Sequence, residues 1–173
     1  MTSALRIRRA TPDANEQDRS ALVDLLLPVF RAGDTYTVDP KIDADGAVAL
    51  WCAPGKTVFL VEDGAGTVLG TYYIRPNHPG GGAHVCNCGY VTARQSQGKG
   101  VARAMLSHSI ETAREMGYRA MQYNFVVSTN ARAIKTWQHA GFEVVGRLPG
   151  AFHHPTEGYV DALVMMLDLT DGD

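Results

Sequence analysis

Two glycines, Gly98 and Gly100, stand at the start of a segment with amphipathic helical spacing, and this loop is well suited to hold an anion. Glycine has no Cβ, so backbone N–H groups can approach and surround oxygen atoms. The N–H groups in the first turn of a helix lack partners within it, and the helix dipole favours negative charge there. The loop therefore predicts binding of a phosphate or diphosphate group.

Three anion-binding patterns compete for this loop. The P-loop pattern fails, because Ala93 stands where its first glycine is required and Gly100 where its Ser or Thr is required. The dinucleotide fingerprint fails because Arg103 replaces its third glycine. The pattern Gln/Arg-x-x-Gly-x-Gly/Ala is met by Gln97, Gly100 and Ala102. Because that pattern is short, the loop alone also fits an ordinary turn from a strand to a helix.

A second group of candidates consists of asparagines in strand-like segments. Asn87 lies in residues 83–91, and Asn124 lies in residues 121–127. Asparagine is depleted in strands and costs free energy when it is buried without partners. The two amides therefore predict either a functional site or positions where each one satisfies a frayed backbone.

Other polar residues have two interpretations each. Arg75 could receive a carboxylate or could be an ordinary charge at the end of a strand. His153 and His154, in a loop expected between the last two strands, could border a substrate mouth or be solvated. Glu62 ends a strand near a turn and is expected to be exposed.

Composition excludes several classes of function. The chain has 173 residues, of which 45% are hydrophobic and 20% charged, so we expect a single domain with its core at about residues 5–169. A net charge of -2 without a cluster of Lys and Arg predicts no nucleic-acid partner. The chain lacks both a membrane-length apolar run and the apolar segment of a secretory signal, so we expect no membrane partner and a cytoplasmic protein. Three cysteines predict reduced thiols, and Cys86 and Cys88 favour core packing over a metal site.

The elements that must position these residues follow from periodicity and turn signals. Strands are predicted at residues 5–9, 56–63, 67–76, 83–91, 121–127, 142–147 and 159–169. Helices are predicted at residues 13–31, 43–51, from the glycine loop to about 116, and from 128 to a stop at Gly141. Pro28 is expected to break the first helix into pieces. This order predicts an α/β domain with a mixed sheet.

Two segments carry a resemblance to a known family. Residues 130–142 (NARAIKTWQHAGF) resemble the segment Asn-x-x-Ala-x-x-x-Tyr-x-x-x-Gly-Phe of the GCN5-related N-acetyltransferases, and residues 91–106 resemble the acetyl-coenzyme A loop of that family. The resemblance implies an α/β fold with a mixed, mostly antiparallel sheet, whose central strands splay apart between flanking helices. It also implies acetyl-CoA as co-substrate and a small-molecule amine as acceptor. The lack of a second Cys/His pair at ligand spacing predicts no metal.

The same resemblance implies roles for particular residues. Asn130 would brace the second helix beside the cofactor, the main chain of Val91 and Ala93 would bind the pantetheine amides, and Tyr36 and Asp34 would line the acceptor pocket. The coenzyme A pyrophosphate would be bound by Gln97, Gly98, Lys99, Gly100, Val101 and Ala102. Members of the family are often dimers, so a homodimer through the last strands is expected.

The chain departs from the family pattern at two positions that matter for proton transfer. Trp137 replaces the Tyr that acts as general acid in many members, and residues 83–91 contain no carboxylate to relay the amine proton. The combination of CNCGYV, NFVVSTN and this Trp resembles the narrower group that acetylates L-azetidine-2-carboxylate and related proline-like imino acids. That resemblance implies Asn87 as the catalytic residue that orients the ring nitrogen, and Asn124 as a residue that binds the polar end of the substrate.

Two alternatives stay open at this point. The acceptor could be a different amine, such as a polyamine, an aminoglycoside or a protein N-terminus. Alternatively, the missing Tyr and Glu could indicate a non-catalytic acyl-coenzyme A sensor.

Overall fold

The chain alternates strands and helices in the predicted order, β-α-α-β-β-β-α-β-α-β-β. The computed structural model describes residues 5–13 and 15–170. Two short 3-10 turns, Gly80–Gly82 and Arg94–Ser96, flank the fourth strand. The elements are β1 (Arg6–Arg9), α1 (Glu16–Ala32), α2 (Ala44–Trp51), β2 (Thr57–Glu62), β3 (Val68–Pro76), β4 (Val85–Thr92), α3 (Val101–Glu115), β5 (Ala120–Val127), α4 (Ala131–His139), β6 (Glu143–His154) and β7 (Gly158–Asp168).

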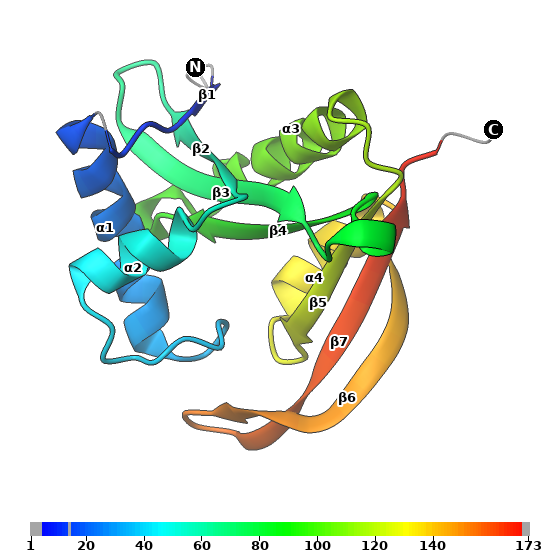
Figure 1. Cartoon of the computed structure of the whole chain (residues 1–173). Helices are drawn as coiled ribbons and strands as arrows, with labels where there is room; N and C mark the ends of the chain where they lie inside the picture. The colour runs from blue at the N-terminus through cyan, green and yellow to red at the C-terminus, as the bar shows by residue number, and fades with distance from the viewer. Residues whose placement is uncertain (1–4, 14, 171–173) are drawn as a thin grey trace.

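One sheet, in the order β1-β2-β3-β4-β5-β7-β6, organises the described residues. Its strand pairs are antiparallel, with the exception of the parallel pair β4–β5. That pair is joined at Val85–Ala120 and Cys86–Met121, and beyond these residues the two strands run apart, as Figure 1 shows. The predicted fold class, a mostly antiparallel mixed sheet with splayed central strands, is confirmed.

Helices cover both faces of the sheet (Figure 1). The face that carries Leu60, Tyr73 and Val91 packs against α1 and α2, in a core that includes Leu26 and Trp51. The opposite face carries side chains such as Tyr72, Cys88 and Tyr123, which pack against α3 and α4. The predicted core packing of Cys86 and Cys88 is confirmed, because both are buried in this second core.

Beyond Cys86 and Met121, β4 and β5 leave an opening between them. The pairing of β4 with β3 determines which main-chain groups of β4 face this opening. Ala93 N–H donates to Leu69 O at one end of the pair, and Asn77 N–H donates to Val85 O at the other. In an antiparallel ladder, hydrogen-bonded residues alternate with residues whose N–H and C=O point the other way. Odd-numbered residues of β4 therefore bond to β3. The main-chain groups that face the opening belong to Cys88, Tyr90 and Thr92.

The first helix is continuous, so the prediction that Pro28 breaks it is wrong. Helix α1 runs from Glu16 to Ala32 with Pro28 inside it. Proline in a helix interior costs about 3 kcal/mol, because it removes one hydrogen bond and crowds the preceding turn. Leu25, Leu26 and Phe30 are buried on both sides of the proline, and this packing keeps the two halves in line.

Strand β6 is longer than the sequence predicts, whereas β7 lies within one residue of its predicted bounds. Strand β6 continues to His154, so His153 and His154 lie in a strand and not in a loop. A register shift between Leu148 and Phe152 absorbs Pro149 and Gly150, which follow the predicted end of the strand at residue 147. The His153 ring stacks on Tyr159 of β7, with the ring centroids 4.7 Å apart.

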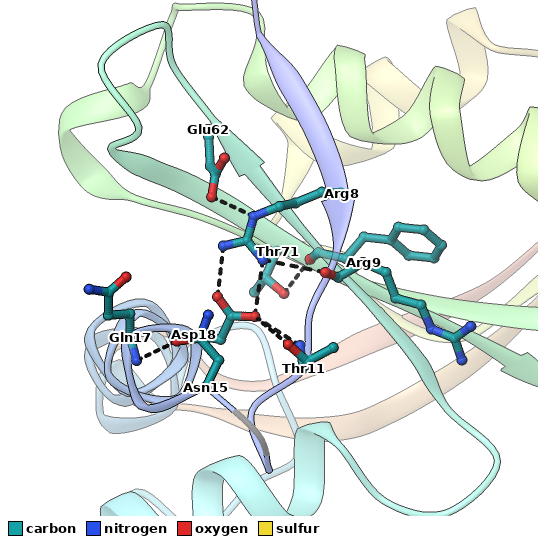
Figure 2. A network of polar contacts seen from close by, with 9 residues as sticks. Arg8, Arg9, Thr11, Asn15, Gln17, Asp18, Glu62 and Thr71 are labelled. Atoms are coloured by element: carbon teal, nitrogen blue, oxygen red, sulfur yellow. Dashed lines mark hydrogen bonds and ion pairs between the residues drawn. The ribbon is translucent and has the colours of Figure 1, made fainter.

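A polar network joins β1, α1 and β2 (Figure 2). The Arg8 guanidinium donates to both carboxylate oxygens of Asp18, at 2.7 and 3.0 Å, and Arg8 Nε donates to Glu62 Oε1 at 2.7 Å. Thr11 N–H donates to Asp18 at 2.8 Å. The Glu62 side chain is 12% exposed, so its predicted exposure is wrong. The reason is that Arg8, from the neighbouring strand, draws it against the sheet.

Across residues 5–13 and 15–170, no helix combines the length and the apolar character needed to span a bilayer.

Candidate functional site

The glycine loop turns sharply just before α3. Gly98 and Gly100 have φ values of 80° and 78°, in the left-handed region, and Gly100 is the N-cap of α3 without any side-chain cap. A Cβ added at either glycine would meet no atom within 4 Å, so the surface of the loop is open. A backbone with this conformation and open space around it suits an incoming group of oxygen atoms.

The loop leaves several main-chain donors free. Within the described part of the chain, the N–H groups of Gly98, Gly100, Val101 and Ala102 donate to no protein acceptor. Gln97 N–H and Lys99 N–H are used inside the turn, by Arg94 O and Ser96 O. Four of the six residues predicted to bind the pyrophosphate therefore present free main-chain donors. Gln97 and Lys99 are exposed at the same loop, where their side chains are accessible.

The main-chain groups of Val91 and Ala93, which were predicted to bind the pantetheine amides, are directed toward β3. Ala93 N–H bonds to Leu69 O, and Val91 pairs with Thr71, so the main-chain groups of both residues face β3. Neighbouring residues of a strand direct their N–H and C=O groups to opposite sides, so the main-chain groups of Tyr90 and Thr92 face the opening instead. The physical reason is that a shift of one residue in a strand exchanges its two sides.

Tyr36 reaches this edge of β4 from the loop after α1. Its hydroxyl accepts a hydrogen bond from Tyr90 N–H at 2.9 Å and donates one to Tyr90 O at 2.8 Å. The Tyr36 ring contacts Phe30 and Trp51 edge-on, and burial raises the pKa of its hydroxyl well above the ordinary value. Tyr36 was predicted to line the acceptor pocket; its hydroxyl is used by the main chain of β4. Asp34 is half-buried in the same loop, and the described residues offer it no hydrogen bond or ion pair.

Asn87 lies where β4 and β5 begin to part. Its side chain is buried, and Nδ2 donates to Gln122 O of β5 at 3.0 Å, one residue beyond the last paired position. This bond replaces the ladder bond that is lost when the strands separate, as one of the two interpretations predicts. It also fixes the amide, with Oδ1 at 3.4 Å from the hydroxyl of Tyr73.

Tyr73 forms one wall beside Asn87. Its ring lies across Gly89, where an added Cβ would be 2.6 Å from Cε1 of the ring, so only glycine fits there. Trp51 packs edge-on against Tyr73 with centroids 4.8 Å apart, and Lys56 Nζ lies 4.1 Å from the Tyr73 centroid. Burial, followed by the charge of Arg75, lowers the pKa of Lys56 to about 8. The wall is therefore aromatic with a cation at its edge.

Asn124 lies in an irregular part of β5. The register with β7 shifts between Tyr123 and Val126, and such bulges re-aim side chains near functional sites. Asn124 Nδ2 donates to Asn77 Oδ1 at 2.7 Å, and its Oδ1 accepts from Gln122 Nε2 at 3.1 Å. Asn87 and Asn124 thus belong to one polar cluster, on the face of the sheet that packs against α1 and α2.

The opposite face of the opening is closed by aromatic residues. The hydroxyls of Tyr90 and Tyr123 lie 2.8 Å apart, and Ser109 bonds to Tyr90 at 2.7 Å, so side chains bridge β4 and β5 there. Trp137 packs against Tyr123 with ring centroids 4.8 Å apart. Asn130 is the N-cap of α4 but makes no side-chain capping bond, so its predicted bracing role has no hydrogen bond behind it.

Sequence reasoning missed part of the cluster. Tyr73 and Asn77 were not singled out, although Tyr73, Arg75 and Asn77 alternate along one strand end. A period of two places such residues on one face of a sheet. Arg75 lies directly opposite Asn87 in the register, which brings this alternating set to the opening. The alternation was the signal that could have found them.

Comparison with known proteins agrees with this geometry. Residues 20–142 match the model of the Acetyltransferase (GNAT) family. N-acetyltransferase aca1 of Schizosaccharomyces pombe is 32% identical over 153 residues, covering 76% of this chain and 71% of aca1. A GCN5-related N-acetyltransferase from Kribbella flavida is 40% identical, with a TM-score of 0.88 over 95% of this chain and 98% of that one. The yncA structure from Salmonella typhimurium, solved with its cofactor acetyl-CoA, shares the fold at 24% identity, with a TM-score of 0.81 over 99% of this chain and 97% of that one.

The chain therefore belongs to the GCN5-related N-acetyltransferase (GNAT) family. It is an N-acetyltransferase, and its acetyl donor is acetyl-CoA, the co-substrate of this family.

Proposed function

We propose that this N-acetyltransferase transfers the acetyl group to the ring nitrogen of a proline-like imino acid, with azetidine-2-carboxylate as the first candidate. The observation that carries the proposal is the fixed amide of Asn87 at the point where β4 and β5 part. Its Nδ2 is held by Gln122 O, and its Oδ1, which accepts a hydrogen bond of 3.4 Å from the Tyr73 hydroxyl, can accept a second one.

Asn87 Oδ1 accepts the N–H of the ring amine and aims the nitrogen lone pair at the thioester carbonyl. An amide oxygen is no strong base, so its contribution is orientation. Burial and the nearby cations Arg75 and Lys56 disfavour an ammonium ion, so the acceptor is held as the neutral amine. The ammonium proton leaves to water before attack. As the N–C bond forms and the C–S bond breaks, the second proton goes to solvent and coenzyme A leaves as the thiolate.

Tyr90 N–H is the donor that we assign to the thioester oxygen. It faces the opening, and negative charge gathers on that oxygen in the transition state, where a preorganised N–H stabilises it. The Tyr36 hydroxyl occupies this N–H in the structure and must release it when the thioester binds. The free N–H groups of Gly98, Gly100, Val101 and Ala102 hold the pyrophosphate, with Gln97 and Lys99 beside it.

The leaving thiolate requires little help from an acid. Trp137 stands where many family members have a Tyr, and its ring packs against Tyr123 instead of offering a proton. Burial raises the pKa of the Tyr73 hydroxyl, so this hydroxyl stays protonated and can donate a hydrogen bond near the site. Asn124, which bonds to the side-chain amides of Asn77 and Gln122, helps to hold the polar end of the acceptor. Asp34 lines the entrance to the same pocket.

A transfer assay tests the proposal. The protein is mixed with acetyl-CoA and single amines, and released coenzyme A is detected with a thiol reagent while mass spectrometry identifies the product. We expect release with azetidine-2-carboxylate to exceed release with spermidine, an aminoglycoside or a peptide N-terminus. Faster turnover of one of those amines would overturn the imino acid assignment and leave the acetyltransferase assignment intact.

We also propose a homodimer through the β6–β7 hairpin. Val145, Leu148 and Tyr159 on these strands are 57%, 39% and 77% exposed, which is unusual for apolar side chains grouped on one hairpin. Light scattering after size-exclusion chromatography should give twice the mass of the 18.7 kDa chain. A mass of one chain at micromolar concentration would contradict the dimer.

A further inference from the structure

Arg75 is a cation without a visible counter-charge. Its Nε is buried and makes no hydrogen bond within residues 5–13 and 15–170, and no carboxylate of these residues forms an ion pair with it. Leaving a buried N–H donor unpaired costs about 1–3 kcal/mol in general. Arg75 as a whole is half-buried, and its buried Nε is open to a partner that the described residues do not provide.

Asn77 adds a second unpaired donor. Its Oδ1 accepts from Asn124 Nδ2 at 2.7 Å, which fixes the amide, while its own Nδ2 is buried without a partner among the described residues. Asn77 follows Arg75 by two positions and, like it, pairs with β4. Two buried donors of this kind on one strand end are rare, because buried polar groups are almost always hydrogen-bonded.

The surroundings are positive. Lys56 lies near Arg75, whose charge contributes to its lowered pKa, and Lys56 Nζ bonds to Leu50 O and to the face of Tyr73. Within the described residues, Lys56 has no carboxylate partner either. The cations Arg75 and Lys56, together with the unpaired Nδ2 of Asn77, favour an anion with planar, paired oxygens. Arg binds such a group through its fork of N–H donors.

The distance to Asn87 matches one class of ligand. Arg75 and Asn87 are directly opposite in the β3–β4 register, and facing side chains in a sheet start about 5 Å apart at Cβ. In an α-amino or α-imino acid, one carbon separates the nitrogen from the carboxylate. With the nitrogen at Asn87 Oδ1, the carboxylate falls on the side of Arg75.

We propose that Arg75 and Asn77 bind the carboxylate of the acceptor, so that the enzyme selects amines with an α-carboxylate over the same amines without one. The inference rests on the proposed function, because it uses the amine position at Asn87. It assigns substrate selection to the end of β3, which the catalytic steps above do not use.

The test compares matched pairs of acceptors that differ only in the carboxylate. The pairs are azetidine-2-carboxylate with azetidine, proline with pyrrolidine, and an α-amino acid with its decarboxylated amine. Values of kcat/KM are measured for wild type, Arg75→Gln, Arg75→Lys and Asn77→Asp. Circular dichroism and the Kd for coenzyme A serve as controls for folding.

We expect wild type to prefer the carboxylate member of its best pair by about 100-fold, as for a lost charge-assisted pair. Arg75→Gln should lower kcat/KM for that acid by at least about 30-fold and change the value for the matched amine less than about threefold, while Arg75→Lys restores part of the loss. Asn77→Asp keeps the oxygen that accepts from Asn124 but places a negative charge beside the substrate carboxylate. The kcat/KM for the acid should therefore fall at least about tenfold.

The outcomes separate this inference from the proposed function. If an open-chain α-amino acid is the best acceptor and Arg75→Gln abolishes the preference for it, the carboxylate site stands and the imino acid assignment falls. If azetidine-2-carboxylate is acetylated and Arg75→Gln lowers the acid and the amine equally, the carboxylate site is wrong and the proposed function stands. An acceptor without a carboxylate that outperforms every acid would overturn the site.

Discussion

Arg8 and Arg75 lie on strands of the same sheet, yet their surroundings differ in one respect. Arg8 meets Asp18 and Glu62, and its hydrogen bonds close a network that joins three elements (Figure 2). Arg75 has no acidic partner in the described chain, and its Nε is buried and unpaired. A network that satisfies itself stabilises the fold, whereas one that leaves donors unpaired is ready for a ligand. The two arginines therefore contrast a closed network, which supports the fold, with the end of β3, where we propose that the acceptor carboxylate binds.

The closed network gives the largest expected effect. Asp18→Asn leaves Arg8 short of a buried partner, so the free energy of unfolding should fall by about 3 kcal/mol, while kcat and the Kd for coenzyme A stay unchanged. Urea unfolding measures the loss, and the melting temperature should drop by about 9 °C for a chain of this size. The matched control is Asp45→Asn, which removes an exposed pair with Arg19 and should cost less than about 0.5 kcal/mol. Equal losses in the two variants would contradict the distinction.

Low pH should remove the stabilisation that the Arg8–Asp18 ion pair provides. The hydrogen bonds from Arg8 lower the pKa of Asp18 in the folded state, so the unfolded chain binds its proton at higher pH. The stabilisation is therefore present above about pH 4 and is lost as the pH falls through the folded pKa. The difference between wild type and Asp18→Asn should shrink below that pH. A constant difference down to pH 2.5 would show that Asp18 acts through packing alone.

The glycine loop gives the next largest expected effect, because its proposed role depends on main-chain N–H groups that stay free for the pyrophosphate. Gly100→Asp places a carboxylate among the free N–H groups and should raise the Kd for coenzyme A about 100-fold, or about 2.7 kcal/mol. Gly66→Asp is the control, since Gly66 has a φ of 81° and the same open space in the turn between β2 and β3. Both variants carry the same backbone strain. Calorimetry that shows equal Kd values for the two would refute the loop assignment.

Asn87 tests whether the open region also orients the amine. Asn87→Ala should lower kcat with the imino acid at least about tenfold and leave the Kd for coenzyme A within about twofold. The lost bond to Gln122 should also cost about 1 kcal/mol of stability. Asn87→Asp loses the same donor but keeps an oxygen acceptor, so it should share the stability loss and retain more turnover. Unchanged kcat in Asn87→Ala would remove this residue from the mechanism.

The Tyr36 hydroxyl gives the smallest expected effect. Its removal should lower the stability of the fold and tighten the binding of acetyl-CoA. Tyr36→Phe leaves Tyr90 N–H and C=O without a partner, so the free protein should lose about 1 kcal/mol of stability. Acetyl-CoA no longer competes with the hydroxyl and should bind about fivefold more tightly. Tyr118→Phe, at a half-buried ring whose hydroxyl bonds to no described residue, should change neither quantity. Weaker binding in Tyr36→Phe would show that the hydroxyl supports the cofactor instead of yielding to it.

Much of the fold could be predicted, because its signals are local. The order of strands and helices, the glycine turn before α3 and the burial of Cys86 and Cys88 each follow from a few neighbouring residues. The errors arose where distant contacts decide. Packing of α1 overrides the preference of Pro28, and a bulge in β6 absorbs Pro-Gly. Arg8, from another strand, holds Glu62.

The site divides in the same way. Sequence alone determined that Gly98 and Gly100 form a turn with free donors and that polar amides lie on the parting strands, since glycine conformation and residue type are written in the chain. Only the tertiary structure decided that Tyr90, and not Val91, faces the opening, and that Arg75 lies opposite Asn87 without an acidic partner. The reason is that strand register and ion pairing depend on residues far apart in the chain. A shift of one position in a strand turns every side chain and every N–H to the other side.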